Sequence, residues 1–209
     1  MNRASSLLLV VTTASLTGCA SSVFQSTWKA PDAAPLQVQG AKVIAVAMMT
    51  EISSRRAAED ALAREITLRG AVGIPMYSIA PNVSTNDEAG ARAAIEAAGA
   101  EGVVVMRPLG VDRETVTDPM VYSAPMYGGY WGGYYGAGWG APYGGMVYGG
   151  GTYTNTLVSV ETLIYSMRQN KLVWGGRSRT TNPESLDALI AELSEAVSKE
   201  LRKAGLTGR

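Results

Sequence analysis

The chain has 209 residues, of which 18 are basic and 18 acidic, so its formal net charge at pH 7 is zero. Because no basic excess or basic patch is present, nucleic acid is not expected as a partner. Histidine is absent and Cys19 is the only cysteine, which removes the commonest general base, the usual metal-ligand clusters and any disulfide within the chain. We therefore expect no metal and no cofactor.

Residues 1–18 have the pattern of a secretory signal peptide. Arg3 gives the start a positive charge, residues 7–11 form a short apolar centre, and small residues precede a cleavage point. The apolar stretch is shorter than the roughly 20 residues that a membrane-spanning helix needs. These residues are therefore expected to be removed after export.

Leu16, Thr17, Gly18 and Cys19 form a tetrapeptide that resembles the lipobox of bacterial lipoproteins. The resemblance implies that Cys19 receives a diacylglycerol and becomes the first residue after cleavage. Two or three acyl chains make attachment effectively permanent, whereas one chain binds only marginally. Because no aspartate follows Cys19, the resemblance also implies sorting to the outer membrane, with the domain facing the periplasm. The alternative is an ordinary signal peptide cut near Ala20.

The mature chain divides into a tether and one domain. Pro31 and Pro35 interrupt any periodicity in residues 19–40, which favours a lipidated tether. Residues 41–206 carry the ordered patterns and are expected to form a single periplasmic α/β domain, consistent with a mature length of about 190 residues.

Strands and helices alternate through the first half of this domain. Continuous apolar runs predict buried strands, and apolar residues at i and i+4 followed by glycine predict helices. The expected elements are, in chain order, a strand at 43–49, a helix from Ser53 or Ser54 to Arg69, a strand at 74–80, a helix from Ser84 or Thr85 to Ala98, and a strand from Val103 extended through Val111 and Val116. Such alternation is typical of parallel βαβ crossovers.

The second half begins with a predicted hairpin. Residues 154–167 alternate between two faces, residues 168–171 form a turn, and residues 172–174 return as a strand.

A final helix closes the domain. Asn182 followed by Pro183 predicts the helix start, Leu193 and Leu201 belong to a continuous apolar stripe, and Gly205 marks the end.

The element order β-α-β-α-β-β-β-α predicts a two-layer α/β domain with a mixed sheet. The sequences at 42–49, 69–70, 171–174 and 205–206 resemble those of uncharacterised periplasmic lipoproteins. Their domain is similar in layout to that of the curli-secretion and penicillin-binding-protein-activator lipoproteins. The resemblance implies protein contact or self-assembly.

Residues 119–153 form a low-complexity, glycine- and tyrosine-rich insertion within the domain. No charged residue lies between Asp118 and Glu161. Aromatic side chains with polar tips suit contact with a partner or a glycan, and the candidate contact residues are Tyr130, Trp131, Tyr134, Tyr135 and Trp139. A plain surface loop is the alternative, and a membrane-inserted hairpin is disfavoured because prolines and glycine pairs break the alternation that it needs.

Two patterns could indicate catalysis. Ser26 and Lys29 match the Ser-x-x-Lys nucleophile motif, but its companion motifs are absent. The acidic pairs Glu59-Asp60, Asp87-Glu88 and Asp112/Glu114 are expected to be solvated charges, the first two in or near first helical turns.

We therefore expect a non-enzymatic, membrane-anchored lipoprotein of the cell envelope that acts by protein–protein contact or assembly. The alternative is a glycan or peptidoglycan binder that uses the aromatic insertion.

Overall fold

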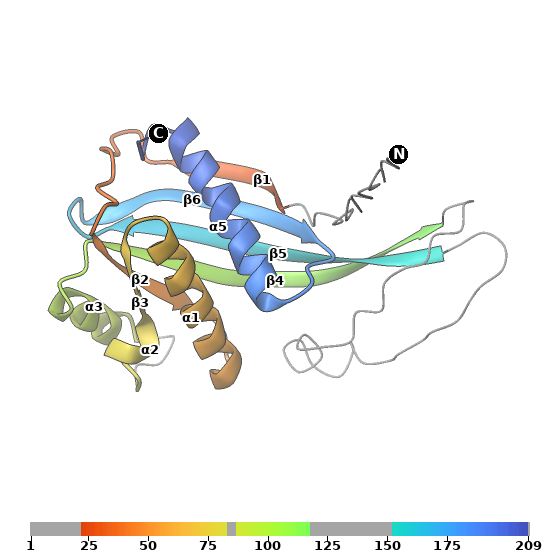
Figure 1. Cartoon of the computed structure of the whole chain (residues 1–209), viewed down its shortest axis with the longest axis horizontal. Coiled ribbons are helices and arrows are strands. Elements are labelled where there is room, and N and C mark those ends of the chain that lie inside the picture. The colour runs from red at the N-terminus through yellow and green to blue at the C-terminus, as the bar shows by residue number, and fades with distance from the viewer. Residues whose placement is uncertain (1–21, 83–86, 118–151, 209) are drawn as a thin grey trace, which may run out of the picture.

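The computed structural model describes residues 22–82, 87–117 and 152–208, which form an α/β fold around one six-stranded sheet (Figure 1). The strands lie in the order β1-β6-β5-β4-β2-β3. Their bounds are β1 Ser22–Lys29, β2 Lys42–Ala47, β3 Val72–Pro75, β4 Gly102–Thr117, β5 Thr152–Ser166 and β6 Lys171–Thr181. The helices are α1 Ile52–Leu68, α2 Met76–Ile79, α3 Glu88–Ala97 and α5 Leu186–Lys203. The predicted α/β class with a mixed sheet is confirmed, because β2 pairs in parallel with β3 and β4 while β4, β5, β6 and β1 pair antiparallel.

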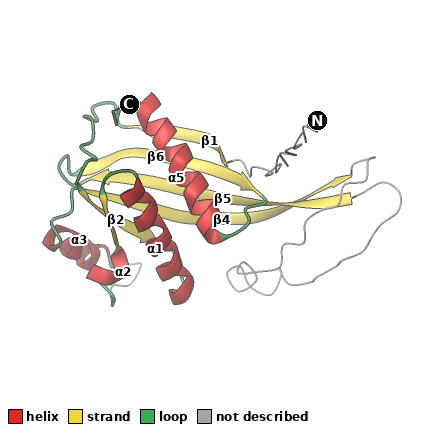
Figure 2. Ribbon diagram, viewed as in Figure 1, coloured by secondary structure: helices red, strands yellow, loops and turns green. Residues whose placement is uncertain are grey.

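The helices cover the two faces of the sheet unequally. The long helices α1 and α5 pack together on one face, above β2, β4 and β5 (Figure 2). On the opposite face, Met76 of α2 and Ile95 of α3 pack with Ile44 and Val103 of the parallel strands. Because Ile44 and its neighbour Ala45 point to opposite faces and both are fully buried, β2 is covered on both sides, as its apolar run predicts.

β1 corrects the prediction of a tether over residues 19–40. Ser22–Lys29 pairs antiparallel with β6 and forms one edge of the sheet. Phe24 packs edge-on against Trp174 with ring centroids 5.5 Å apart, and the Lys29 Nζ donates a hydrogen bond of 2.7 Å to the Ala204 carbonyl oxygen. The folded domain therefore includes residues that precede position 41.

The predicted strand at 74–80 is also corrected. β3 ends at Pro75, and residues 76–79 form the short helix α2. Proline has no N–H to donate to a strand partner, whereas its fixed φ is compatible with the start of a helix. Pro75 is accordingly the N-cap residue of α2.

The N-cap of helix α1 lies two or three residues before the predicted caps at Ser53 or Ser54. Glu51 is the N-cap, and its carboxylate accepts hydrogen bonds from the backbone N–H groups of Ser53 at 2.9 Å and Ser54 at 2.6 Å. The Ser53 hydroxyl also donates to this carboxylate at 2.6 Å. The side-chain hydrogen bonds from Ser53 and Ser54, together with the two backbone bonds, lower the pKa of Glu51 to about 2. Gly70, with φ at +93°, follows the last turn as predicted.

Helix α3 begins at Glu88 behind the N-cap Asp87, whose side chain accepts from the Gly90 N–H. The predicted start of this helix, Ser84 or Thr85, lies outside the described residues. The acidic pair Asp87-Glu88 thus supplies the cap and the first-turn charge of the helix.

Helix α5 starts at Leu186 behind the N-cap Ser185, not at the predicted Asn182-Pro183. Asn182 instead extends the sheet: its side-chain oxygen accepts from the Thr156 N–H at 2.7 Å, and its own N–H donates to the Thr156 carbonyl. The cap-like sequence is therefore used to close β6 against β5.

Glu59 is buried, which corrects the prediction of a solvated charge. It lies on α1 with 2% of its surface exposed. Its carboxylate accepts from the backbone N–H of Tyr77 at 2.8 Å and from that of Ala47 at 3.4 Å. Burial raises the pKa of Glu59 above its usual range. This side chain joins α1 to the end of β2 and to α2.

Replacing Glu59 with glutamine is expected to lower the free energy of unfolding by about 1–3 kcal/mol, because the amide NH₂ cannot accept from the second backbone N–H. Urea denaturation followed by circular dichroism measures the change. Asp60→Asn is the matched control, since Asp60 accepts a hydrogen bond from a side-chain hydroxyl, that of Tyr77. An equal loss in both variants would contradict the special role of the buried carboxylate.

Candidate functional site

The residues that sequence analysis assigned to the anchor and to aromatic contacts lie outside the described residues. They are Leu16, Thr17, Gly18, Cys19, Tyr130, Trp131, Tyr134, Tyr135 and Trp139. Their roles stay predictions.

Metal-ligand clusters and the Ser-x-x-Lys motif are the two catalytic features considered in the described ranges. No group of three or more potential metal ligands occurs there. None of the helices in those ranges combines the length and apolarity needed to cross a bilayer. Ser26 lies opposite Arg177 in β1, whereas Lys29 three residues later is hydrogen-bonded to Ala204. Residues three apart in a strand point to opposite faces, so these two side chains do not form a nucleophile–base pair.

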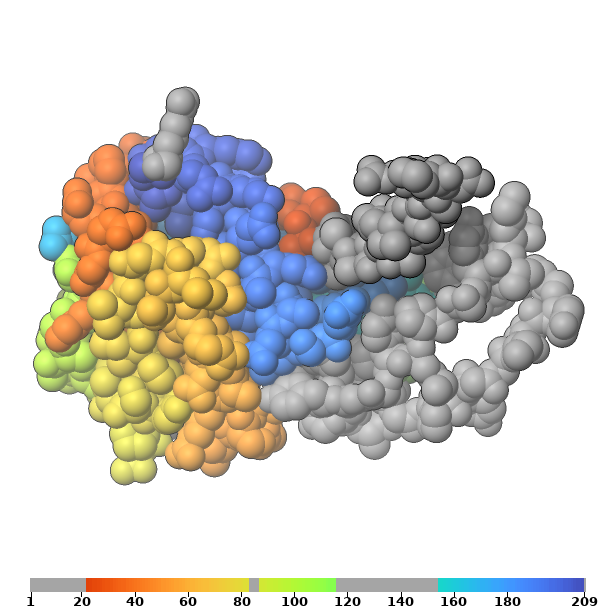
Figure 3. All heavy atoms as spheres, viewed as in Figure 1, coloured from red at the N-terminus to blue at the C-terminus, as the bar shows by residue number. Residues whose placement is uncertain are grey.

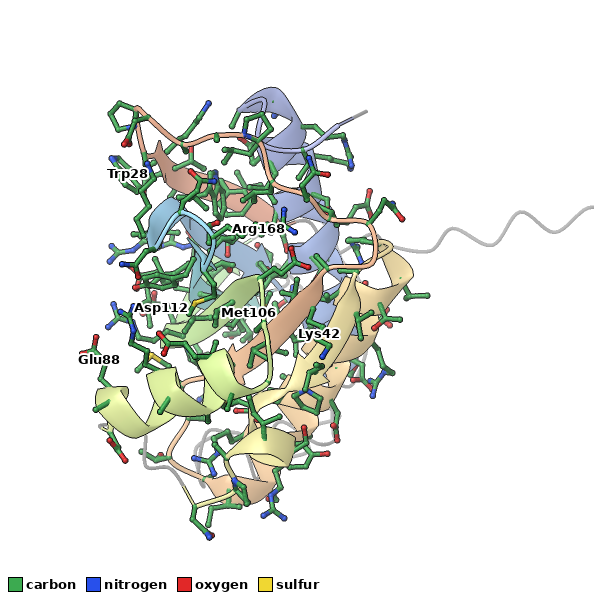
Figure 4. The ribbon with its side chains drawn as sticks, turned by 90° about the vertical axis from the view of Figure 1, so that its left-hand side faces the viewer. Trp28, Lys42, Glu88, Met106, Asp112 and Arg168 are labelled. Carbon is green, nitrogen blue, oxygen red and sulfur yellow. The ribbon has the colours of Figure 1, made fainter. Side chains whose placement is uncertain are left out.

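The feature of interest is the sheet face that points away from α1 and α5. At the β2–β3 end this face is covered by α2 and α3. No helix in the described ranges covers it over β1, β6, β5 and the second half of β4 (Figure 4). We call this area the open face. By strand register and alternation its residues are Val23, Ser26, Trp28, Arg107, Asp112, Leu157, Ser159, Glu161, Leu163, Tyr165, Arg177 and Arg179.

A row of charges crosses the open face. Glu161 of β5 lies directly between Arg107 of β4 and Arg177 of β6. Its Oε2 forms an ion pair with the Arg107 guanidinium at 2.5 Å. Opposite charges on directly paired strand positions attract, while two arginines on one carboxylate leave an excess of positive charge. The row is therefore positively charged on the β6 side.

Arg179 lies in the next row along β6, between Ser159 of β5 and Val23 of β1. Its Nε is buried and has no hydrogen-bond partner among the described residues. A buried donor without a partner costs about 1–3 kcal/mol. The open face thus includes an arginine with an N–H group that makes no hydrogen bond to the described residues.

Aromatic and apolar side chains lie beside these charges. Trp28 of β1 is 50% exposed and faces away from α1 and α5 (Figure 4). It pairs with Gly175, which has no side chain, and Leu163 lies on the far side of that glycine. Val23 and Tyr165 are also exposed large apolar residues. The open face therefore combines an aromatic and aliphatic area with an arginine-rich row.

Sequence analysis missed this site for two reasons. It assigned Val23 and Trp28 to the tether, and it ended the last strand at residue 174, before Arg177 and Arg179. The period-two pattern of Arg177, Ser178, Arg179 and Thr180 is the signal that would have extended this strand. Asp112 and Glu114 are exposed, as expected.

No protein-family model and no curated protein matches the chain. Among solved structures, it is similar to a variant PelC dodecamer from Paraburkholderia phytofirmans, at 11% identity over 86% of this chain and 96% of that chain, with a TM-score of 0.45. A second PelC dodecamer from that organism matches at 10% identity over 79% of this chain and 89% of that one, with a TM-score of 0.40. The lipoprotein GNA1162 from Neisseria meningitidis matches at 16% identity over 78% of this chain and 99% of that one, with a TM-score of 0.38.

Proposed function

We propose that the protein is a non-enzymatic lipoprotein of the cell envelope, anchored in the outer membrane through acylated Cys19, and that it acts by binding a protein partner through its open face. The Leu-Thr-Gly-Cys sequence at residues 16–19 supports the anchor. The composition and exposure of the open face support the partner contact.

The observation that carries the contact proposal is the coexistence of Trp28 with Arg177 and Arg179 on one uncovered surface. Aromatic residues and arginine are enriched in protein interfaces. They are also the residue types that most often dominate the binding energy. A strand face is a rigid scaffold, because each residue is held by the hydrogen bonds of its neighbours.

The chemistry of the open face specifies its partner in part. Carboxylates on the partner would form ion pairs with Arg177 and would accept a hydrogen bond from the Nε of Arg179. An apolar side chain would pack on the exposed ring of Trp28. Complementary charge accelerates association and selects against wrong partners. The expected partner therefore presents acidic residues next to an apolar group.

In-cell photocrosslinking tests the contact. A benzoylphenylalanine introduced at position 28 is expected to capture one defined protein, identified by mass spectrometry. Position 68 is the control, because Leu68 is 78% exposed but lies at the end of α1, away from the open face. Charge reversal by Arg177→Glu and Arg179→Glu is expected to reduce the yield at position 28. Equal products from positions 28 and 68 would contradict the proposal.

The same cells test the anchor. Cys19→Ser removes the thiol that would carry the lipid, so the variant is expected to lose its acyl chains and to leave the detergent-extracted membrane fraction. Metabolic labelling with a fatty acid measures the lipid. A labelled Cys19→Ser variant would disprove the anchor at this position.

The charge-free aromatic insertion favours one second function, the binding of glycan or peptidoglycan. Purified sacculi would then retain the wild-type protein but not a variant in which residues 120–152 are replaced by a short Gly-Asn turn. Retention that is unchanged in the variant would contradict this function.

A further inference from the structure

A cavity of about 680 Å³ lies inside the helical layer, between α1, α5 and the sheet. Its rim includes the segment before β2, at Leu36 and Gln37, and the last described residues, Thr207 and Gly208. Figure 3 shows this segment, in orange, beside the dark-blue C-terminal end of α5. Small-molecule sites usually measure about 300–1,000 Å³. The cavity is therefore large enough for one small ligand.

The wall of the cavity is mainly aliphatic. Both helices and two central strands contribute to it through Leu62, Ile66, Val104, Met106, Ile164 and Leu201. Such a wall favours an apolar chain by about 0.8 kcal/mol for each methylene group removed from water.

Two buried hydroxyl groups interrupt this apolar wall. Thr162 on β5 is 0% exposed and Ser194 on α5 is 7% exposed, and both line the cavity. Neither side-chain oxygen has a hydrogen-bond partner among the described residues. Buried hydroxyls are normally satisfied, because an unmade hydrogen bond is costly. These two hydroxyl donors therefore indicate a ligand that is mostly apolar but carries a hydrogen-bond acceptor, such as a carbonyl oxygen, next to its apolar chain.

The rim has the opposite chemistry. Arg69 lines it from the end of α1, where its Nε donates to the Ser198 hydroxyl and its Nη1 pairs with Glu65. Arg202 lines it from α5 and is exposed. The carboxylate on this rim, Glu101, is ion-paired with Arg168. The mouth therefore favours a polar or anionic head group over a cationic one.

We propose that this cavity binds a single lipid acyl chain. The hydrocarbon lies along the aliphatic wall, and the carbonyl oxygen at its head accepts hydrogen bonds from the Thr162 and Ser194 hydroxyls. The polar end of the molecule emerges at the rim near Arg69 and Arg202. A neutral carbonyl fits the dry interior, since an isolated charge there would be far more costly. A monoacyl glycerophospholipid carries such an ester carbonyl next to its polar head group, and a fatty acid offers a neutral carbonyl oxygen when its carboxyl group binds in the protonated form.

Calorimetric titration tests the site in the full chain carrying Cys19→Ser, so that no covalent lipid competes. Two probes distinguish the sources of the acyl chain: palmitate, and palmitoyl lysophosphatidylglycerol below its micelle concentration. Saturable binding of either probe supports the proposal and identifies the head group. Absence of saturable binding by both probes overturns it.

A matched pair of ligands tests the role of the two hydroxyls. Ether-linked hexadecyl lysophosphatidylglycerol has no carbonyl oxygen, so it is expected to bind roughly tenfold more weakly than the palmitoyl ester, the loss of two modest hydrogen bonds. In the double variant Thr162→Val/Ser194→Ala, ester and ether are expected to bind equally. If the variant keeps the preference for the ester, or if the wild type shows none, the assignment of the hydroxyls is overturned.

Thr180→Val is the control variant. Thr180 is a buried threonine on the neighbouring strand β6, and it bonds the Ser22 hydroxyl at 2.6 Å instead of lining the cavity. Its substitution is expected to leave the preference for the ester unchanged. Thermal melting confirms that each variant is folded. Substitution of Thr162 by isosteric valine is not expected to lower the melting temperature, because its hydroxyl has no partner to lose.

Discussion

Replacing Trp174 with alanine is expected to lower the free energy of unfolding by about 3–5 kcal/mol, the range for large buried aromatic residues. Trp174 is 1% exposed and is the largest fully buried side chain of the described domain. It packs against Phe24 of β1 and belongs to a cluster with Val197 and Leu201 of α5. The substitution therefore removes the contact that connects the edge strand to the last helix.

The backbone around Trp174 is shaped to hold the ring. A Cβ atom on Gly176 would come within 2.5 Å of the Trp174 ring and 2.7 Å of the Phe24 ring. The neighbourhood is thus already filled, and it can collapse only partly into the space left by alanine. Partial collapse leaves a cavity, and the cost of a cavity adds to the lost burial.

Guanidinium denaturation followed by circular dichroism measures the loss. The control is Trp28→Ala, which removes the same side chain from the same sheet at a position that is half exposed. A partly exposed substitution away from the core is expected to change stability by about 1 kcal/mol or less. Losses of equal size in the two variants would contradict the assignment of Trp174 to the core.

The sequence predicts the central strands and the last helix because the buried positions of these elements are occupied by apolar residues. β2 and the first half of β4 are apolar runs, and both are buried by helices on each face. The stripe of α5, including Leu193 and Leu201, is buried as predicted. Where one side of an element is apolar and periodic, the element and its buried side follow from pattern alone.

The elements that escaped prediction bury polar side chains or lie at an edge. Ser178 and Thr180 of β6 are fully buried, and the Ser178 hydroxyl donates to the Val160 carbonyl oxygen. Small polar residues can be buried when their hydroxyls donate hydrogen bonds to backbone oxygens, but in the sequence they do not indicate a buried core. Every residue of β1 is exposed or half-buried, and the pairing of this strand with β6 joins residues about 150 positions apart. Local pattern carries no information about such a partner.

The open face could not be predicted for the same reason. Arg107, Glu161 and Arg177 form one row only because three strands pair in one register. In the sequence these residues are scattered charges, which are normally solvated. The cavity is equally non-local, since Thr162 and Ser194 come from a strand and a helix that meet only in the folded domain. The anchor, by contrast, is a contiguous motif and needs no fold to be recognised.

Replacing Leu193 with alanine is expected to lower the free energy of unfolding by about 2–5 kcal/mol. Leu193 is 1% exposed at the centre of α5, in the cluster that joins this helix to Leu62 of α1 and to Met106 and Val158 of the sheet. The side chain therefore contacts both components of the helical layer and the strands below them.

The matched control is Leu68→Ala, which removes an identical side chain from a helix position that is 78% exposed. Its effect is expected to stay within about 0.5 kcal/mol. Urea denaturation of both variants gives the comparison, with the slope of the transition serving as a check that each unfolds as one unit. If Leu193→Ala melts like the wild type while Leu68→Ala does not, the buried stripe of α5 faces solvent and the packing of α5 on α1 is wrong. If Leu193→Ala alone is destabilised, the buried face of α5 stabilises the domain. Ser194 and Leu201, which line the cavity, lie on this same face.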